Sequence, residues 1–266
     1  MIRKCIYGGV VLTALLFITG CSSSGGTAGG DGDAEETELL IQQKGNRLAE
    51  TNVKLGVGYF QQGNYEYALV KFRKALEIDD NLPNGHYAIA LLYERLGKPN
   101  TAVKHFERAI EINPQYSDAY NAYAAFLCRK KQYEGADKRF KKALENPLYR
   151  SHALVRLNAG LCAMRAGNPQ RAENYFRSLL KANPKHATAL FQMAKINLEA
   201  KQYLKARGYI QRFGLVSKHT AQSLLVGLKI ERVLGGRDDL AKYALLLQHK
   251  FPDSDEAQEL LASERR

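Results

Sequence analysis

The sequence predicts an all-α solenoid of about six antiparallel helix pairs, with a short helix at its C-terminal end. Two observations support this prediction. An alanine followed four residues later by a bulky apolar residue recurs at a nearly constant interval, and a small residue precedes most of these alanines by twelve positions. The chain also opens with a short apolar run that ends at a cysteine. Because one helix pair cannot cover its own apolar face, the repeated units must stack.

Residues 1–20 have the pattern of an export signal. Arg3 and Lys4 form a short positive end, and residues 6–18 are apolar apart from two glycines and Thr13. This run is shorter than the roughly 20 residues of a membrane-spanning helix, and it fits a secretory signal peptide. The run ends at Thr19-Gly20-Cys21, which resembles a bacterial lipobox. We therefore expect Cys21 to be lipidated as the first residue of the mature protein; the alternative is a plain cleaved signal with an incidental cysteine.

Residues 21–37 are predicted to be the lipidated cysteine and a flexible tether. After Cys21 the segment contains only serine, glycine, threonine, alanine and acidic residues. Such a composition cannot bury enough apolar surface to offset the entropy lost on ordering. Sixteen flexible residues span about 20–25 Å on average. We expect the tether to hold the folded domain, residues 38–266, within about one domain diameter of the membrane.

The repeat is defined by six alanines and by the bulky residues that follow them. The pairs are Ala68 with Phe72, Ala102 with Phe106, Ala136 with Phe140, Ala172 with Phe176, Ala206 with Ile210, and Ala241 with Leu245. The alanine spacings are 34, 34, 36, 34 and 35 residues. The small residues twelve positions earlier, where two helices must approach closely, are Gly56, Ala90, Ala124, Gly160 and Ala194, whereas Lys229 stands near this position in the sixth repeat.

These spacings resemble those of tetratricopeptide repeats, which implies a right-handed superhelix of helix pairs. The predicted repeats lie near residues 49–82, 83–116, 117–152, 153–186, 187–220 and 221–252. Gly63, Gly97 and Gly167 fall where the first helix of a pair ends, which suits a left-handed C-terminal cap. The spacing of 36 puts two extra residues near Pro147-Leu148-Tyr149, in a longer loop between the third and fourth repeats. Residues 253–263 are predicted to form a short helix that covers the last repeat.

Composition and motifs do not support catalysis. Beyond residue 20 the chain has 37 basic and 27 acidic side chains, a net charge of +10, and these are scattered over the predicted helices. Export argues against nucleic acid as a partner. The sequence has no zinc-protease HExxH motif, no CxxC motif, no GxSxG motif and no constellation of paired carboxylates. We expect no enzyme activity, metal, cofactor or small-molecule substrate.

Function is therefore expected in the concave wall that first helices form in a solenoid of this kind. In the first two repeats this wall is predicted to present Val53, Val57, Phe60, Tyr87 and Leu91 as a partner-binding patch. The third repeat offers Asp118, Asn121 and Arg129. A second apolar patch is predicted in the fourth repeat, at Leu154, Leu157, Leu161 and Met164. Large exposed apolar patches are typical of binding sites; the alternative is that neighbouring helices or the tether cover them.

Cys128 and Cys162 lie on first helices of neighbouring repeats. If their Cα atoms are within about 7 Å they can form a disulfide, which an oxidising compartment would preserve. Spacing alone leaves two alternatives open, this bridge or two buried free thiols.

Several segments are similar to the PilF/PilW family of type IV pilus lipoproteins. They are LGVGYFQQGNYEYALVKFRKALEID, NAYAAFLCRKKQYEGADKRFKKALENPLY and NAGLCAMRAGNPQRAENYFRSLL, and the resemblance covers residues 39–262 and the lipobox. It implies a lipid-anchored, periplasm-facing outer-membrane protein that acts as a pilotin: it would help the type IV pilus secretin reach the outer membrane and multimerise. The family pattern has cysteines at both matching positions, which favours the Cys128–Cys162 bridge. The alternative function is a tetratricopeptide lipoprotein scaffold for outer-membrane protein assembly or for recruiting peptidoglycan enzymes.

Overall fold

The computed structural model describes residues 31–264, which form thirteen α-helices and no strand. The chain divides into two units after Lys44, and the second unit, which begins at Gly45, is compact and holds the repeats. The helices, in chain order, are α1 (Asp31–Gln61), α2 (Tyr65–Ile78), α3 (Pro83–Arg95), α4 (Pro99–Ile112), α5 (Ser117–Arg129), α6 (Tyr133–Glu145), α7 (His152–Arg165), α8 (Pro169–Ala182), α9 (Ala187–Glu199), α10 (Tyr203–Val216), α11 (Ala221–Leu234), α12 (Arg237–Lys250) and α13 (Asp255–Glu264).

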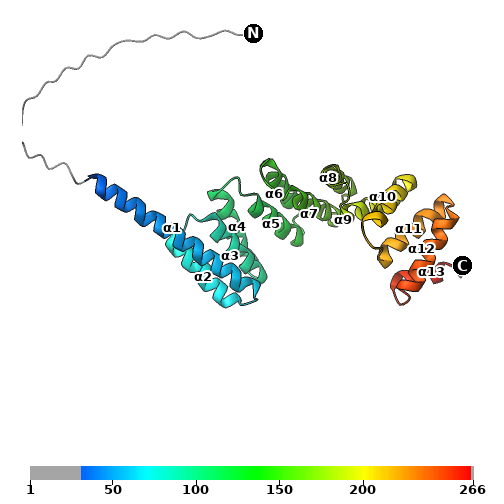
Figure 1. Cartoon of the computed structure of the whole chain (residues 1–266), viewed down its shortest axis with the longest axis horizontal. Helices are drawn as coiled ribbons and strands as arrows, with labels where there is room; N and C mark the ends of the chain where they lie inside the picture. Colours follow the sequence, from blue (N-terminus) through cyan, green and yellow to red (C-terminus); the bar gives the residue numbers. More distant parts are fainter. Residues whose placement is uncertain (1–30, 265–266) are drawn as a thin grey trace, which may run out of the picture. The chain divides into compact units, whose positions relative to one another are not determined.

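Within the second unit the helices pack in the order of the chain, as a solenoid requires. The first and second helix of each repeat form a pair (α3 with α4, α5 with α6, α7 with α8, α9 with α10, α11 with α12), and each second helix also contacts the first helix of the next repeat. Figure 1 shows this succession of helix pairs. The prediction of an all-α tetratricopeptide solenoid is confirmed.

Close contact between the two helices of a pair depends on the small residue that the sequence places on the first helix. A Cβ atom added to Gly160 would lie 2.5 Å from a ring carbon of Phe176, and one added to Gly56 would lie 2.5 Å from Phe72. Both rings are buried, Phe72 at 1% and Phe176 at 0% exposure. The aromatic ring therefore fills the space that the missing side chain leaves.

The sixth repeat has a different register from the predicted one. Leu245, expected in the core, is 60% exposed, whereas Tyr243 is buried. Tyr243 packs on Gly227, where an added Cβ would lie 2.7 Å from the ring, and Gly227 rather than Lys229 is the small residue of this repeat. The alignment on Ala241 was wrong because residue type alone cannot show which aromatic or leucine side chain has room to enter the interface.

The first helices end as predicted at three glycines. Gly63, Gly97 and Gly167 have φ values of +77°, +69° and +69°, the left-handed conformation that glycine adopts without steric cost. The equivalent residues of the third and fifth repeats are Lys131 and Lys201, with φ values of 61° and 58°. The backbone thus keeps the same turn in these two repeats even where the residue is not glycine.

Two further sequence predictions concern connections. Six residues, 146–151, join α6 to α7, whereas four join each of the other second helices to the next helix, so the longer loop near Pro147-Leu148-Tyr149 is confirmed. At the C-terminal end α13 packs Ala257 and Leu260 into the last core cluster with Leu224 and Leu247. The short helix predicted over residues 253–263 is present.

The predicted end of the tether differs from the structure. Helix α1 begins at Asp31, so residues 31–37, predicted to be flexible, are helical. Composition describes the segment as a whole and does not show at which residue a helix begins. Cys21 and the remainder of the predicted tether lie outside the described residues.

Candidate functional site

Only part of the first predicted patch lies on an accessible surface. Val53 is 6% exposed and belongs to the core with Ala49 and Phe72, so its prediction as a partner-binding residue was wrong. Val57 is half-buried and also packs against this core. Periodicity places both residues on the inner side of the first helix, but it cannot show how far the second helix of the repeat covers them.

Phe60 and Leu91 line a cleft of about 510 Å³ together with three charged residues, Glu94, Arg95 and Arg129. The cleft thus combines residues from α1, α3 and α5. Arg129 binds Glu94 through two nitrogens, with Nε 2.8 Å and Nη2 2.6 Å from Oε1. Arg95 is exposed in the last turn of α3. An apolar wall beside an arginine that extends into solvent suits a partner segment that presents an apolar side chain next to an acidic one.

Tyr87 does not line this cleft but joins a second cluster one helical turn away on α3. Its ring packs edge-on against Tyr116, with centroids 5.4 Å apart. Next to them, the Tyr149 hydroxyl donates a 2.6 Å hydrogen bond to Oδ1 of Asp118. Burial, and then the Asp118 carboxylate, raises the pKa of Tyr87. We call Tyr87, Tyr116, Asp118 and Tyr149 the tyrosine–aspartate cluster.

Sequence reasoning named Tyr87 and Asp118 as wall residues but missed Tyr116 and Tyr149. Tyr116 is the N-cap of α5, and Tyr149 lies in the loop of six residues between α6 and α7. The two-residue insertion was the signal that could have found Tyr149. An insertion that occurs at a single junction can add to the surface a side chain that the regular repeat does not supply.

The second predicted patch is less open than the sequence suggested. Leu154 is 49% exposed, but Leu157, Leu161 and Met164 are half-buried and pack against the second core cluster. That cluster contains residues of the fourth, fifth and sixth repeats, so these three side chains contribute to the core. The prediction of a binding patch is thus supported by an accessible side chain only at Leu154.

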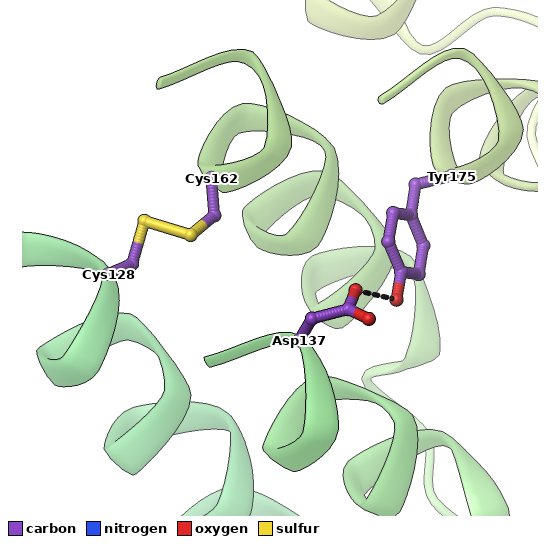
Figure 2. The surroundings of a disulfide bond; sticks show 4 residues. All are labelled: Cys128, Asp137, Cys162 and Tyr175. Atoms are coloured by element: carbon purple, nitrogen blue, oxygen red, sulfur yellow. Dashed lines mark hydrogen bonds between the residues drawn. A yellow bond between two sulfur atoms is a disulfide. The ribbon is translucent and has the colours of Figure 1, made fainter. Parts of the chain in front are cut away.

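The structure joins Cys128 and Cys162 in a disulfide, with the sulfur atoms 2.13 Å and the Cα atoms 5.9 Å apart. The bond links α5 to α7, the first helices of the third and fourth repeats. Figure 2 shows it beside a second connection of the same junction, in which the Tyr175 hydroxyl lies 2.7 Å from Oδ1 of Asp137. Lys141 also binds Asp137, at 2.9 Å. The third and fourth repeats, which the longer loop connects, are therefore linked both through their first helices and through their second helices.

Two features typical of other function classes are absent from residues 31–264. No group of three or more histidine, cysteine or acidic side chains in this part of the chain is arranged to hold a metal ion. None of its helices is long and apolar enough to cross a membrane.

Comparison with known proteins agrees with this architecture. Family profiles described as tetratricopeptide repeat match residues 83–116, 105–138 and 157–214, and one described as TPR repeat matches residues 56–97. The type IV pilus assembly protein PilF of Pseudomonas aeruginosa is 32% identical over 257 residues, which are 95% of this chain and 98% of that protein. This chain belongs to the PilF/PilW family.

Solved structures of family members have the same fold. One, from a functional characterization of Pseudomonas aeruginosa PilF, is 32% identical, covers 83% of this chain and 99% of its own, and gives a TM-score of 0.71. Another is PilW, described as a widely conserved type IV pilus biogenesis factor; it is 29% identical, covers 80% of this chain and 98% of its own, and gives a TM-score of 0.65. The resemblance to the PilF/PilW family seen in the sequence is confirmed.

The segments that carried this resemblance have identifiable places in the fold. The stretches FLC and NAGLC within these segments contain the two cysteines of the disulfide. The stretch NPLY, residues 146–149, is the first part of the longer loop and ends at Tyr149. All three lie at the junction between the third and fourth repeats. Parts of two of the three family-like segments thus lie where this solenoid departs from a regular tetratricopeptide array.

Proposed function

We propose that this PilF/PilW family member is an outer-membrane lipoprotein adaptor, a pilotin, that promotes the outer-membrane localisation and multimerisation of the type IV pilus secretin. The observation that carries this proposal is its identity of 32% with a type IV pilus assembly protein over almost the whole of both chains. The tetratricopeptide solenoid supports it, because such solenoids act through extended surfaces that bind other proteins. The proposed role is binding rather than catalysis.

The mechanism has two parts, an anchor and a binding surface. The lipobox at Cys21 supports lipid attachment, and each buried methylene of an acyl chain contributes about 0.8 kcal/mol to membrane binding, so that more than one chain gives stable anchoring. The folded domain would then face the periplasm. Its cleft at Phe60 and Leu91 would take an apolar side chain of the secretin, and Arg95 would pair with an adjacent acidic one.

The proposal is tested by the state of the secretin in outer-membrane fractions of the host. Cells that lack the protein and cells that carry Cys21→Ala are compared with wild type, and detergent-resistant secretin multimers are measured by immunoblotting. We expect multimers to disappear, or to move to the inner membrane, in both strains. Normal multimers in both would contradict the pilotin function and favour a scaffold for another envelope process.

The cleft is tested separately from the anchor. Leu91→Asp places a charge against the apolar wall, and Leu204→Asp is the matched control, because Leu204 is 72% exposed on a second helix outside the cleft. We expect Leu91→Asp to reduce secretin multimers several-fold and Leu204→Asp to leave them unchanged, with both proteins folded by circular dichroism. Equal multimer levels in the two variants would remove the cleft from the mechanism.

A further inference from the structure

The tyrosine–aspartate cluster is built from separate parts of the chain. Tyr87 comes from α3, Tyr116 and Asp118 from the start of α5, and Tyr149 from the longer loop before α7. Asp118 is exposed, and the three tyrosines are half-buried. Leu148, the residue before Tyr149, is 87% exposed. The two-residue insertion at this junction therefore places an aromatic side chain against Asp118 and an apolar one in solvent beside it.

The charge of Asp118 is not neutralised within the described part of the chain. Its carboxylate accepts a hydrogen bond from the Tyr149 hydroxyl. Among residues 31–264, no lysine or arginine forms an ion pair with it, although the chain as a whole is strongly basic. Burial, the Asp118 hydrogen bond and the Asp118 charge raise the pKa of Tyr149, so its hydroxyl remains a donor at physiological pH.

An accessible carboxylate with tyrosine side chains beside it is suited to a cation. The carboxylate supplies charge, and tyrosine rings attract cations through their electron-rich faces, most effectively where water is partly excluded. Asp118 also lies in the first turn of α5, where an acidic residue is favoured by the helix dipole alone. That role explains the aspartate but not the three tyrosines around it or the inserted loop that supplies one of them.

We propose that the tyrosine–aspartate cluster binds a lysine or arginine side chain of the partner segment that lies along the concave wall. The identity of the partner, the type IV pilus secretin, rests on the proposed function. The cluster continues the cleft described above, because Tyr87 and Leu91 are four residues apart and share one face of α3.

The two ends of this surface have opposite charge, which restricts the orientation of the partner. Asp118 at one end and Arg129 at the other are eleven positions apart on α5, or about 16 Å at 1.5 Å per residue. Arg95 adds positive charge to the same end as Arg129. An extended segment rises about 3.3 Å per residue. A matching segment would thus carry its basic residue about five extended positions from the apolar and acidic residues that enter the cleft.

The cation site is tested first without the secretin. The full folded domain, labelled with ¹⁵N, is titrated with N-acetyl-lysine methylamide, and amide shifts are followed by NMR. We expect saturable shifts at the four cluster residues that are lost in Asp118→Asn. The control is Glu66→Gln, which also removes an exposed acidic residue from the first turn of a helix. If Asp118→Asn is destabilised, Tyr149→Phe is used instead and should weaken binding several-fold. Shifts that are absent, or unchanged in the variant, overturn the site.

A second measurement separates the site from the identity of the partner. Secretin multimers are compared in cells with wild-type protein, with Asp118→Lys, with Glu66→Lys and without the protein. Both proposals are supported if multimers are lost without the protein and if, of the two variants, only Asp118→Lys reduces them several-fold. If they are lost without the protein but Asp118→Lys matches wild type, the secretin does not use this site and the inference is wrong. If they are normal without the protein, the pilotin function fails, whereas a positive titration keeps the cation site for another partner.

Discussion

The Tyr175 hydroxyl donates a 2.7 Å hydrogen bond to the Asp137 carboxylate and so ties α8 to α6 across the junction of the third and fourth repeats. Burial alone would raise the pKa of Asp137, but the hydrogen bonds from Lys141 and Tyr175 outweigh it, and its pKa lies below the ordinary 3.8. In a solenoid, contacts between neighbouring repeats supply much of the stability. This bond therefore helps to fix the junction whose longer loop carries Tyr149, one residue of the tyrosine–aspartate cluster.

Replacing Tyr175 with phenylalanine should lower the free energy of unfolding by about 1–2 kcal/mol, because the change removes a hydrogen bond to a charged acceptor. Urea unfolding at neutral pH measures the change. Tyr209→Phe is the matched control: it is the equivalent tyrosine of the next repeat, and its hydroxyl has no hydrogen-bond partner among the described residues. Because the folded pKa of Asp137 is lowered, its contribution is present above pH 4 and is lost below it. A difference of similar size for both variants would contradict this account.

Two glycine-to-alanine changes should alter stability in opposite directions. In Gly160→Ala the new methyl group would lie 2.5–2.8 Å from three atoms of the buried Phe176 ring, so we expect a loss of about 1–3 kcal/mol from overpacking. In Gly208→Ala nothing lies within 4 Å, and alanine is the better helix former, so we expect a gain of about 0.5–1 kcal/mol. Thermal melts of both variants check the signs, and a stabilising Gly160→Ala would show that the aromatic ring can move aside.

Removing the disulfide should destabilise the domain without changing its fold. The bond closes a loop with a sequence separation of 34, for which the loss is about 2–4 kcal/mol. Urea unfolding is compared for wild type, for wild type with reductant, and for the double variant Cys128→Ala and Cys162→Ala. We expect the last two to agree and reductant to have no further effect on the variant. Equal midpoints with and without reductant in the wild type would mean that the bond adds no stability.

The pair His86 and His105 should make stability fall below neutral pH. Their Nδ1 atoms are 3.0 Å apart, and His86 Nε2 donates to the Asp80 carbonyl oxygen at 2.8 Å. Burial, and then the neighbouring His86, lowers the pKa of His105 from 6.5 to about 4. The unfolded chain therefore binds a proton at a higher pH than the folded one, so this stability is complete above pH 6.5 and is lost as the pH falls towards 4.

At about pH 5 the resulting loss is of the order of 1–2 kcal/mol, given that the ring is partly accessible to solvent. Melting temperatures at about pH 7.5 and about pH 5 measure it. His105→Gln should reduce the difference between the two values, and His249→Gln, at an exposed position, should not. A residual difference is expected from His219, whose pKa is lowered by burial and by Lys242 and Lys250. An unchanged difference in His105→Gln would exclude the histidine pair as its cause.

The sequence by itself determined the repeat, because each feature of the repeat is a local requirement. Alanine or glycine must stand where two helices touch, a bulky apolar side chain must fill the space, and a residue with positive φ must end the first helix, so residue type and spacing predict the helices and the longer loop. The same reasoning found the family, because the segments that resemble it are continuous in sequence. It failed at Leu245, where two residues of suitable type compete for one position.

Only the tertiary structure decided which wall residues are available to a partner. Val53 and Phe60 both lie on the inner side of α1, yet Val53 is in the core and Phe60 lines a cleft, because exposure depends on how closely the neighbouring helices cover each side chain. Likewise, Tyr149 meets Asp118 across 31 positions of sequence. Such contacts depend on how helices and the inserted loop meet in space, and the spacing of residue types along the chain contains no information about them.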